Sequence, residues 1–500
     1  MLVARIAFGL ETPELAVQSL AEVTKLDPSF AEGFYHLGRA LKQTHKLDES
    51  VDAFTAALVI RPDYVSAYCD LGDVLTAQKR FDDAIDSFQK AIQVDPNCFD
   101  AFNNLGLALS YKGRLKESIA CLSRALELNP GSAAPHSNLS VVLNTMGQVD
   151  EAMSSCQRAY MIDPTSAEIC GNLGGFLKDA GKYTESTVML RKAISLDPKY
   201  AKAYNNLGEN FRALGQDHEA LNNYNRTIEL IPNSTYPYSN RQYCMSHMED
   251  ISPAEQLASA KHFGKVIASQ VGARYSSWPV KLESDKLVIG FVSGDFHSHP
   301  VGFALEGLLA GIDRSKFELV AFTSDVREDA LTARIKPLFS TWVEIFGQDD
   351  QSAAQLVHSH GVDILIDLSG HTAGNRLPLF AYKAAPVQVS WLGYWSTTGV
   401  AEIDYKLGDN FLTPADQDEF FSEQIWRLPN SFLCFAPPAA DLPVAPLPAI
   451  KTGQVTFGCF NQYSKVTDRV IAVWCDILSR VRGSRLVLKM AALSDDKVVD

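Results

Sequence analysis

Hydrophobic and polar positions repeat along the first half of the chain with a period of 34 residues. Proline keeps one phase of this period, at Pro28, Pro62, Pro96, Pro130, Pro164, Pro198 and Pro232. A small residue recurs at Gly38, Gly72, Gly106, Ser140, Gly174 and Gly208, and an apolar one at Phe54, Phe88, Leu122, Cys156, Leu190 and Tyr224. Small residues let two antiparallel helices approach closely, bulky ones fill the groove between them, and proline ends the second helix. The pattern therefore predicts stacked helix pairs.

This period and pattern resemble the tetratricopeptide repeat. Six full units cover residues 31–234, after a partial unit that keeps Ala16 and Leu20. Stacks of this kind form a superhelix whose concave face suits peptides. We predict a repeat superhelix over 1–234 and a packed helical bridge over 235–285, with a helix from Pro253 to Gln270 that Asp250 or Ser252 caps.

One polar column precedes the repeat leucine and consists of His36, Asp70, Asn104, Asn138, Asn172 and Asn206. An asparagine amide can both donate to and accept from a peptide backbone, so four asparagines at one helical position suggest a ladder that binds acceptor proteins. Repeats of this kind use the position on their inner surface. A solvated polar face is the alternative.

The second half alternates apolar, β-rich runs with helical stretches. The runs lie at Leu287–Ser293, Phe317–Thr323, Trp342–Phe346, Val362–Leu368 and Val387–Trp391. This alternation predicts βαβ units and a mostly parallel sheet over 286–436. Polar or glycine-containing loops follow three runs, at Gly294–Gly302, Ser369–Arg376 and Leu392–Gly399. Because the carboxyl ends of parallel strands share one edge, these loops should line one crevice.

A proline-rich joint at 437–452 should separate this lobe from the start of a second lobe at 453–500. There Val455–Phe460 and Arg485–Met490 predict strands, and Thr467 can cap a helix from Asp468 to about Val481. Lys465 then stands between a strand end and a helix N-terminus, where a cation and free amides can stabilise a phosphate.

Composition narrows the class of protein. The 500 residues are 46% apolar and 21% charged, which is typical of a soluble globular chain of two or three domains. The net charge of -14 argues against bulk binding to nucleic acid or anionic membranes. No apolar run is long enough to span a membrane, no signal peptide is evident, and the nine cysteines are scattered singly. These features predict a cytoplasmic protein with reduced thiols.

The repeats, together with DFHSHPVG, VQVSWLGYWSTTG and CFNQYSK, resemble the O-linked N-acetylglucosamine (O-GlcNAc) transferases. This family glycosylates proteins with a catalytic core of two Rossmann-like lobes, the GT-B fold. The resemblance implies inverting transfer of N-acetylglucosamine from UDP-GlcNAc to Ser or Thr of intracellular proteins, without a metal or other cofactor. Within these motifs, Asp295 and His299 match the acid–histidine pair next to sugar and acceptor.

The donor site is implied in the same way. Leu392 and Gly393 match backbone that lines the sugar pocket, and Gln462 and Lys465 match groups that hold uridine and the diphosphate. Lys465 would stabilise the charge that builds on the β-phosphate. His299 is a candidate proton acceptor because imidazole titrates near neutrality, and Asp295 could orient it or share the task. The donor's own phosphate is the alternative base.

Metal sites are not favoured. The pairs His297/His299 and His358/His360 lack a third ligand at suitable spacing. The DxD form at 416–418 lies in an acidic loop, which we interpret as surface.

Some positions depart from the family pattern. His371 stands where some relatives have tyrosine, and Val301 replaces a small hydroxyl residue, so the preference for acceptor and sugar is less specified. Relatives carry a second active-site histidine between the repeats and the first strand. The bridge offers His247 and His262, neither in a motif that can be matched.

After Lys465 the sequence supplies one helix and one strand, whereas a doubly wound lobe needs about five or six strands. A fragment of a glycosyltransferase would explain this. A repeat adaptor with a vestigial α/β half, or the same enzyme class with another nucleotide sugar, are the alternatives.

Overall fold

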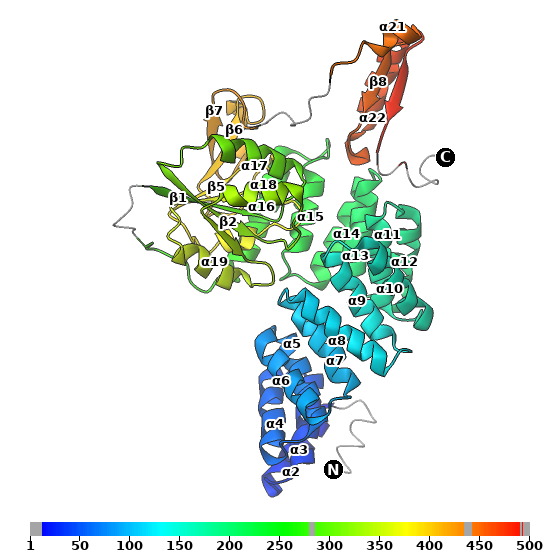
Figure 1. The fold of residues 1–500 in the computed structure, drawn as a ribbon, viewed down its shortest axis with the longest axis vertical. Helices are drawn as coiled ribbons and strands as arrows, with labels where there is room; N and C mark the ends of the chain where they lie inside the picture. The colour runs from blue at the N-terminus through cyan, green and yellow to red at the C-terminus, as the bar shows by residue number, and fades with distance from the viewer. Residues whose placement is uncertain (1–12, 280–285, 435–442, 491–492, 494–500) are drawn as a thin grey trace. The chain divides into compact units, whose positions relative to one another are not determined.

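A computed structural model describes residues 13–279, 286–434, 443–490 and 493 (Figure 1). The chain divides into two compact units, Met1–Pro164 and Thr165–Asp500. The division falls inside the repeats and not at the predicted boundary at 234. Residues of the last repeats, such as Ile228, pack against the core of the α/β lobe, and this joins them to the second unit.

Paired helices of 13 and 14 residues make up the repeats, as the period predicts. The first unit contains α2 (Pro13–Leu26), α3 (Ala31–Gln43), α4 (Leu47–Ile60), α5 (Val65–Ala77), α6 (Phe81–Val94), α7 (Phe99–Tyr111), α8 (Leu115–Leu128), α9 (Ala133–Thr145) and α10 (Val149–Ile162). The second unit continues with α11 (Ala167–Asp179), α12 (Tyr183–Leu196), α13 (Ala201–Ala213), α14 (Asp217–Leu230), α15 (Tyr236–Met245) and α16 (Pro253–Ala268).

The small and bulky columns meet inside each helix pair. A Cβ on Gly72 would lie 2.5 Å from the Phe88 ring, so a larger residue there would have to displace the ring. At the one unit where serine replaces glycine, Ser140, the opposing residue is the smaller Cys156, and both are buried. The repeat pattern is therefore a pattern of helix contacts.

Seven parallel strands form one sheet in the order β3-β2-β1-β4-β5-β6-β7. Their bounds are β1 (Leu287–Ser293), β2 (Phe317–Thr323), β3 (Thr341–Glu344), β4 (Ile364–Asp367), β5 (Val387–Ser390), β6 (Tyr405–Asp409) and β7 (Gln424–Leu428). The connecting helices are α17 (Pro300–Gly311), α18 (Ala330–Ile335), η1 (Lys336–Leu338), α19 (Asp350–Ser359), α20 (Leu377–Phe380) and η2 (Ala415–Phe420). Strands β6 and β7 were not predicted, because each contains a charged residue, Lys406 or Arg427, that interrupts a short apolar run.

Helices α15 and α16 belong to the α/β lobe. Tyr238, Phe263 and Ile267 share one buried cluster with Val288 of β1 and sheet residues beyond it. Of the two predicted caps, Ser252 is the N-cap of α16, and Glu255 completes a capping box with it. The bridge is packed, as predicted, while residues 280–285 lie outside the described part.

The second lobe begins with a two-stranded parallel sheet, β8 (Thr456–Cys459) and β9 (Arg485–Leu488). Between the strands lie η3 (Tyr463–Lys465) and α22 (Asp468–Arg480), which Thr467 caps as predicted. Part of the predicted joint, 437–442, lies outside the described residues, and its end forms the short helix α21 (Pro448–Thr452). The predicted fold class is thus confirmed, a repeat superhelix followed by a parallel α/β core. No described helix is long and apolar enough to cross a membrane.

Candidate active site

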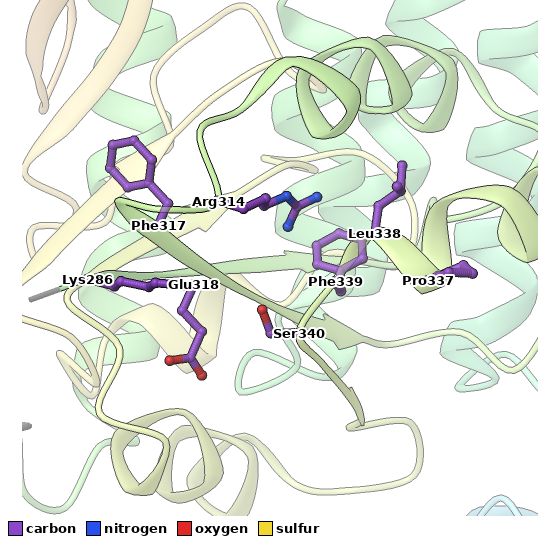
Figure 2. A pocket seen from close by; sticks show the side chains of 8 residues that line it. All are labelled: Lys286, Arg314, Phe317, Glu318, Pro337, Leu338, Phe339 and Ser340. Atoms are coloured by element: carbon purple, nitrogen blue, oxygen red, sulfur yellow. The ribbon is translucent and has the colours of Figure 1, made fainter. Parts of the chain in front are cut away.

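A cavity of about 270 Å³ opens at the carboxyl ends of β1 and β4, where the strand order reverses direction. It is lined by Glu209, Arg212, Asn240, Tyr243, Asp295, His299, His371, Thr372, Ala373 and Gln462. Ligands of open α/β sheets bind at such a switch point. A larger cavity of about 450 Å³, lined by Lys286, Phe317 and Glu318 among others, lies at the opposite edge, beside the amino ends of β1 and β2 (Figure 2). Its position separates it from the catalytic candidates.

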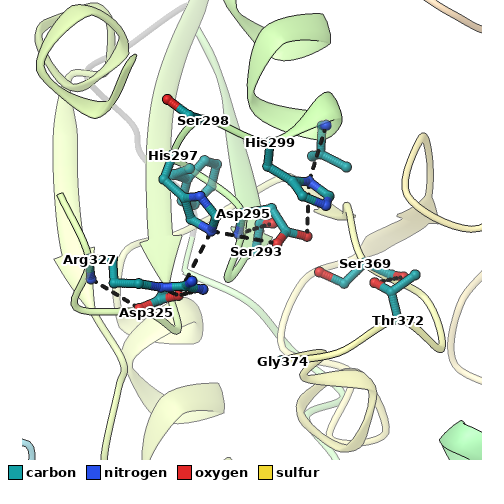
Figure 3. A network of polar contacts seen from close by, with 12 residues as sticks. Ser293, Asp295, His297, Ser298, His299, Asp325, Arg327, Ser369, Thr372 and Gly374 are labelled. Carbon is teal, nitrogen blue, oxygen red and sulfur yellow. Dashed lines mark hydrogen bonds and ion pairs between the residues drawn. The ribbon is translucent and has the colours of Figure 1, made fainter. Parts of the chain in front are cut away.

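Asp295 and His299 lie side by side in the loop after β1 (Figure 3). His299 Nδ1 is 3.7 Å from Asp295 Oδ2. His299 is also the N-cap of α17, where Nδ1 accepts from the Val301 amide at 3.3 Å. This contact favours the tautomer that carries its proton at Nε2. Proton acceptance at Nε2 requires the other tautomer, with Nδ1–H directed to Asp295.

Burial shifts both members of this pair toward their neutral forms. It raises the pKa of Asp295, which the neighbouring His299 and His297 oppose. It lowers the pKa of His299, which Asp295 opposes. A half-exposed, neutral imidazole beside a buried carboxyl is suited to exchanging a proton with a bound hydroxyl.

His297 extends this group toward the loop after β2. Its Nε2 is 3.9 Å from both Asp295 Oδ1 and Asp325 Oδ2, and it is buried without a hydrogen-bond partner. Arg327 Nε donates to Asp325 Oδ2 at 2.7 Å (Figure 3). Asp325 and Arg327 were missed in the sequence, because nothing in TSDVRED marks a site until β1 and β2 are paired.

The loop after β4 is fixed by a buried carboxyl. Asp367 accepts from the amides of Ser369 and Gly370, at 3.1 and 2.9 Å. Burial raises the pKa of Asp367 to about 6, although these amides and Lys406 oppose the shift. The loop then presents Thr372 to the cavity.

The backbone at Leu392 and Gly393 is strained in the way that binding sites often are. Leu392 has a φ of 74°, which a leucine rarely adopts, and the Gly393 amide donates to the Trp391 carbonyl at 3.0 Å. A Cβ on Gly393 would lie 1.9 Å from the Leu368 carbonyl oxygen. Position 393 therefore has no room for a side chain, and the backbone role of Leu392 and Gly393 in the sugar pocket stays a prediction.

Glu423, the residue just before β7, holds the loop after β5 in place. Its carboxylate accepts from Thr397 Oγ1 and from the Thr398 amide, each at 2.7 Å. Lys406 Nζ donates to the Tyr394 carbonyl at 2.7 Å, and burial lowers the pKa of Lys406. The sequence analysis did not predict the roles of Glu423 and Lys406 in holding this loop, because it did not predict β6 and β7.

The predicted donor residues of the second lobe reach this site to different extents. Gln462 lines the cavity together with Asp295 and His299. Lys465 is exposed at the end of η3, and its Nζ lies 6.0 Å from the centre of the Trp395 ring, in the loop after β5.

Between the two bridge histidines the structure makes a clear distinction. His247 stands edge-on to Trp395 at 4.6 Å, and its buried Nε2 has no hydrogen-bond partner. Burial, Arg212 and Lys465 all lower its pKa, although a hydrogen bond with Tyr243 opposes them. His262 lies exposed on α16 beside Tyr238. Of the two, His247 is therefore the one that contacts the loop after β5, a contact that no sequence motif revealed.

His371 is buried and joins three elements. Its Nδ1 is 3.1 Å from Ser239 Oγ of α15, and its Nε2 is 2.9 Å from the Thr398 carbonyl. Burial lowers the pKa of His371 to about 3, so it is neutral. It positions two loops against α15.

The asparagine column is already hydrogen-bonded within the repeats. In the first unit Asn104 donates to Asp73 at 2.8 Å and Asn138 donates to Asn103 at 3.0 Å. In the second, Asn172 accepts from Lys202 at 2.8 Å, and both Asn172 and Asn206 are buried. Asn240, one period after Asn206, donates to Asn205 at 2.9 Å.

The rejected metal candidates have other contacts. His358 stacks on Tyr275 and bonds the Ser277 carbonyl, and Asp418 pairs with Arg427. Among the residues that the structure describes, no group of three or more potential ligands is close enough to hold a metal ion.

Comparison with known proteins divides the chain in the same way, into repeats followed by a glycosyl transferase part. Tetratricopeptide repeat models match residues 4–65, 99–132, 167–200 and 201–234, and the glycosyl transferase family 41 model matches 229–436. A solved mutant of the Thermobaculum terrenum O-GlcNAc transferase is 32% identical, with a TM-score of 0.68, over 73% of this chain and 70% of that one.

The chain belongs to the O-GlcNAc transferase family.

Curated members of this family include plant proteins. The rice protein named probable UDP-N-acetylglucosamine–peptide N-acetylglucosaminyltransferase SPINDLY is 38% identical over 264 residues, which are 52% of this chain and 28% of that protein. The Arabidopsis thaliana protein of the same description named SEC is 29% identical over 238 residues, 45% of this chain and 24% of that protein. The match thus spans about a quarter of these relatives' length.

Proposed function

We propose that this protein transfers N-acetylglucosamine from UDP-GlcNAc to Ser or Thr residues of proteins that its repeats bind. The observation that carries the proposal is the single cavity that joins Asp295 and His299, the loop after β4, Gln462 and the repeat residues Glu209 and Asn240. Donor, acceptor and acid–base groups can meet only at such a place.

In the proposed reaction, the acceptor oxygen attacks the anomeric carbon while the bond from that carbon to the β-phosphate oxygen breaks. The bonding electrons leave with UDP, and the hydroxyl proton passes to a base. His299 in its Nδ1–H tautomer, Asp295, or the donor's phosphate can accept it. Lys465 stabilises the charge on the leaving phosphate, a role that needs no metal ion.

The nine cysteines carry no disulfide in the described residues, and we propose that the protein works in the reducing cytoplasm. The acceptor binds along the inner repeat surface, where the predicted ladder residues Asn104, Asn138, Asn172 and Asn206 contribute amides.

The test is to incubate the full chain with UDP-GlcNAc and a set of Ser- and Thr-containing proteins. We expect one N-acetylhexosamine on Ser or Thr by mass spectrometry, and equal activity after chelation of divalent ions. No transfer, from UDP-GlcNAc or from any other nucleotide sugar tried beside it, would refute the enzyme and leave a repeat adaptor.

A further inference from the structure

Arg212 lies where the active-site cavity meets a second cavity of about 310 Å³. The second cavity is lined by Tyr183, Arg212, Ala213, Phe460, Asn461, Gln462, Tyr463, Ser464, Lys489 and Met490. Only Arg212 and Gln462 line both cavities. A molecule that fills the two must therefore pass these two side chains.

The second cavity has the composition of an anion site. Its lining includes two cations, Arg212 and Lys489, besides amide and hydroxyl groups, and no carboxylate. Two acidic groups lie near Arg212, Glu209 and Asp217. Glu209 accepts from other donors, Lys178, Asn205 and Asn240, and Asp217 accepts from the Cys244 thiol at 3.8 Å. A cation at such a wall is poised for an anionic ligand.

Packing holds the guanidinium in place. Arg212 is part-buried in the last turn of α13 and lies 5.1 Å from the centre of the Tyr243 ring. In the described residues it forms no ion pair with a carboxylate. A nearby second cation, Lys465, acts with Arg212 on His247, so two positive charges face one region from two lobes.

From this placement we infer that Arg212 binds the diphosphate of the sugar donor. A nucleotide sugar carries its diphosphate in the middle, between the nucleoside and the reacting sugar carbon. With the sugar beside Asp295 and His299, the diphosphate falls at the junction of the cavities, and the planar guanidinium suits two of its oxygens. The inference rests on the proposed function and extends it: the repeat superhelix supplies part of the donor site.

The experiment compares binding of UDP and of uridine to the full chain by calorimetry, in the wild type and in Arg212→Gln. We expect UDP to bind about tenfold or more weakly to the variant, because a charge-assisted hydrogen bond is lost, while uridine binds equally. Arg212→Lys should recover only part of the affinity, since an ammonium group cannot bind two oxygens in a plane.

Arg226→Gln is the matched control. Arg226 also lies over a tyrosine of the repeats, at 5.9 Å from the Tyr204 ring, but it is exposed and pairs with Glu229. UDP affinity should not change in this variant.

Each outcome of the binding experiment supports or refutes a stated claim. A wild type that binds no UDP refutes the proposed function and this inference with it. If wild type and Arg212→Gln bind UDP alike, the inference is wrong and the proposed function stands. Equal losses of UDP and uridine would assign Arg212 to packing and also overturn the inference.

Discussion

The repeats and the seven-stranded lobe use glycine for different purposes. In the repeats, Gly38, Gly72, Gly106, Gly174 and Gly208 all face the bulky residue of their own helix pair. In the lobe, Gly393 faces a backbone carbonyl oxygen, that of Leu368, and not a side chain. When one contact is repeated in many units, each copy contributes a small part of the stability. A contact that holds one loop alone carries its whole contribution at one position. Substitutions should therefore have graded effects in the first region and severe effects in the second.

The largest effect should come from Lys465, the cation that we propose stabilises the leaving phosphate. We expect Lys465→Ala to lower turnover by about 100-fold or more, with an unchanged thermal midpoint, because one charge-stabilising donor is lost. Lys451→Ala, in α21 of the same lobe, is the control and should retain full activity. Retained turnover in Lys465→Ala would exclude the phosphate role.

Gly393→Ala should follow. The added Cβ would lie 1.9 Å from the Leu368 carbonyl oxygen, so the loop must shift, and we expect a loss of about 2–4 kcal/mol in unfolding free energy together with most of the activity. Denaturant unfolding and initial rates measure both. At Gly311 a Cβ meets nothing within 4 Å, so Gly311→Ala should change neither. An active, stable Gly393→Ala protein would contradict the strained geometry.

Gly72→Ala tests the graded region. Its Cβ would lie 2.5 Å from the Phe88 ring, and overpacking of this kind costs about 1–3 kcal/mol. Thermal unfolding should show the loss, while transfer to a short peptide acceptor stays unchanged. Gly131→Ala, where the nearest atom is 3.7 Å away, is the matched control.

Replacing four residues together by Ala, Asn104, Asn138, Asn172 and Asn206, should raise KM for a protein acceptor by about tenfold. The reason is that each hydrogen bond from a side-chain amide to the acceptor contributes about 1 kcal/mol or less net. Hydrolysis of the donor should not change. Identical kinetics with the protein acceptor would remove the ladder hypothesis.

The smallest effect should be a shift of the acid limb in the pH profile of kcat/KM. If His299 is the base, its lowered pKa keeps it unprotonated below the ordinary 6.5; if Asp295 is, its raised pKa delays deprotonation above the ordinary 3.8. If His299 is the base, the acid limb of kcat/KM should lie below 6.5 and fall further in Asp295→Asn, because the carboxylate that raises the pKa of His299 is removed. If Asp295 is the base, the limb should lie above 3.8 and disappear in that variant. A limb above 6.5 would exclude His299.

The sequence predicted the parts of this molecule that obey a period. Helix pairs, five of the seven strands and the loops after β1, β4 and β5 follow from spacing and apolar runs. What it could not predict depends on long-range contacts. The contact of His247 with Trp395 is one of them, and the hydrogen bonds of Glu423 with Thr397 and Thr398 are others. Charged residues inside short strands also conceal them, as Lys406 did in β6.

One contact far from the reacting groups has a mechanical consequence. Cβ atoms built on Gly264 of α16 and Gly399 after β5 would each lie 2.0 Å from a backbone carbonyl oxygen of the other segment. Because the two backbones are in direct contact, no side chain lies between them that could change rotamer and absorb a relative movement. Any tilt of α16 must then move the end of the loop that carries Leu392 and Trp395, so that α16 and the loop after β5 move together.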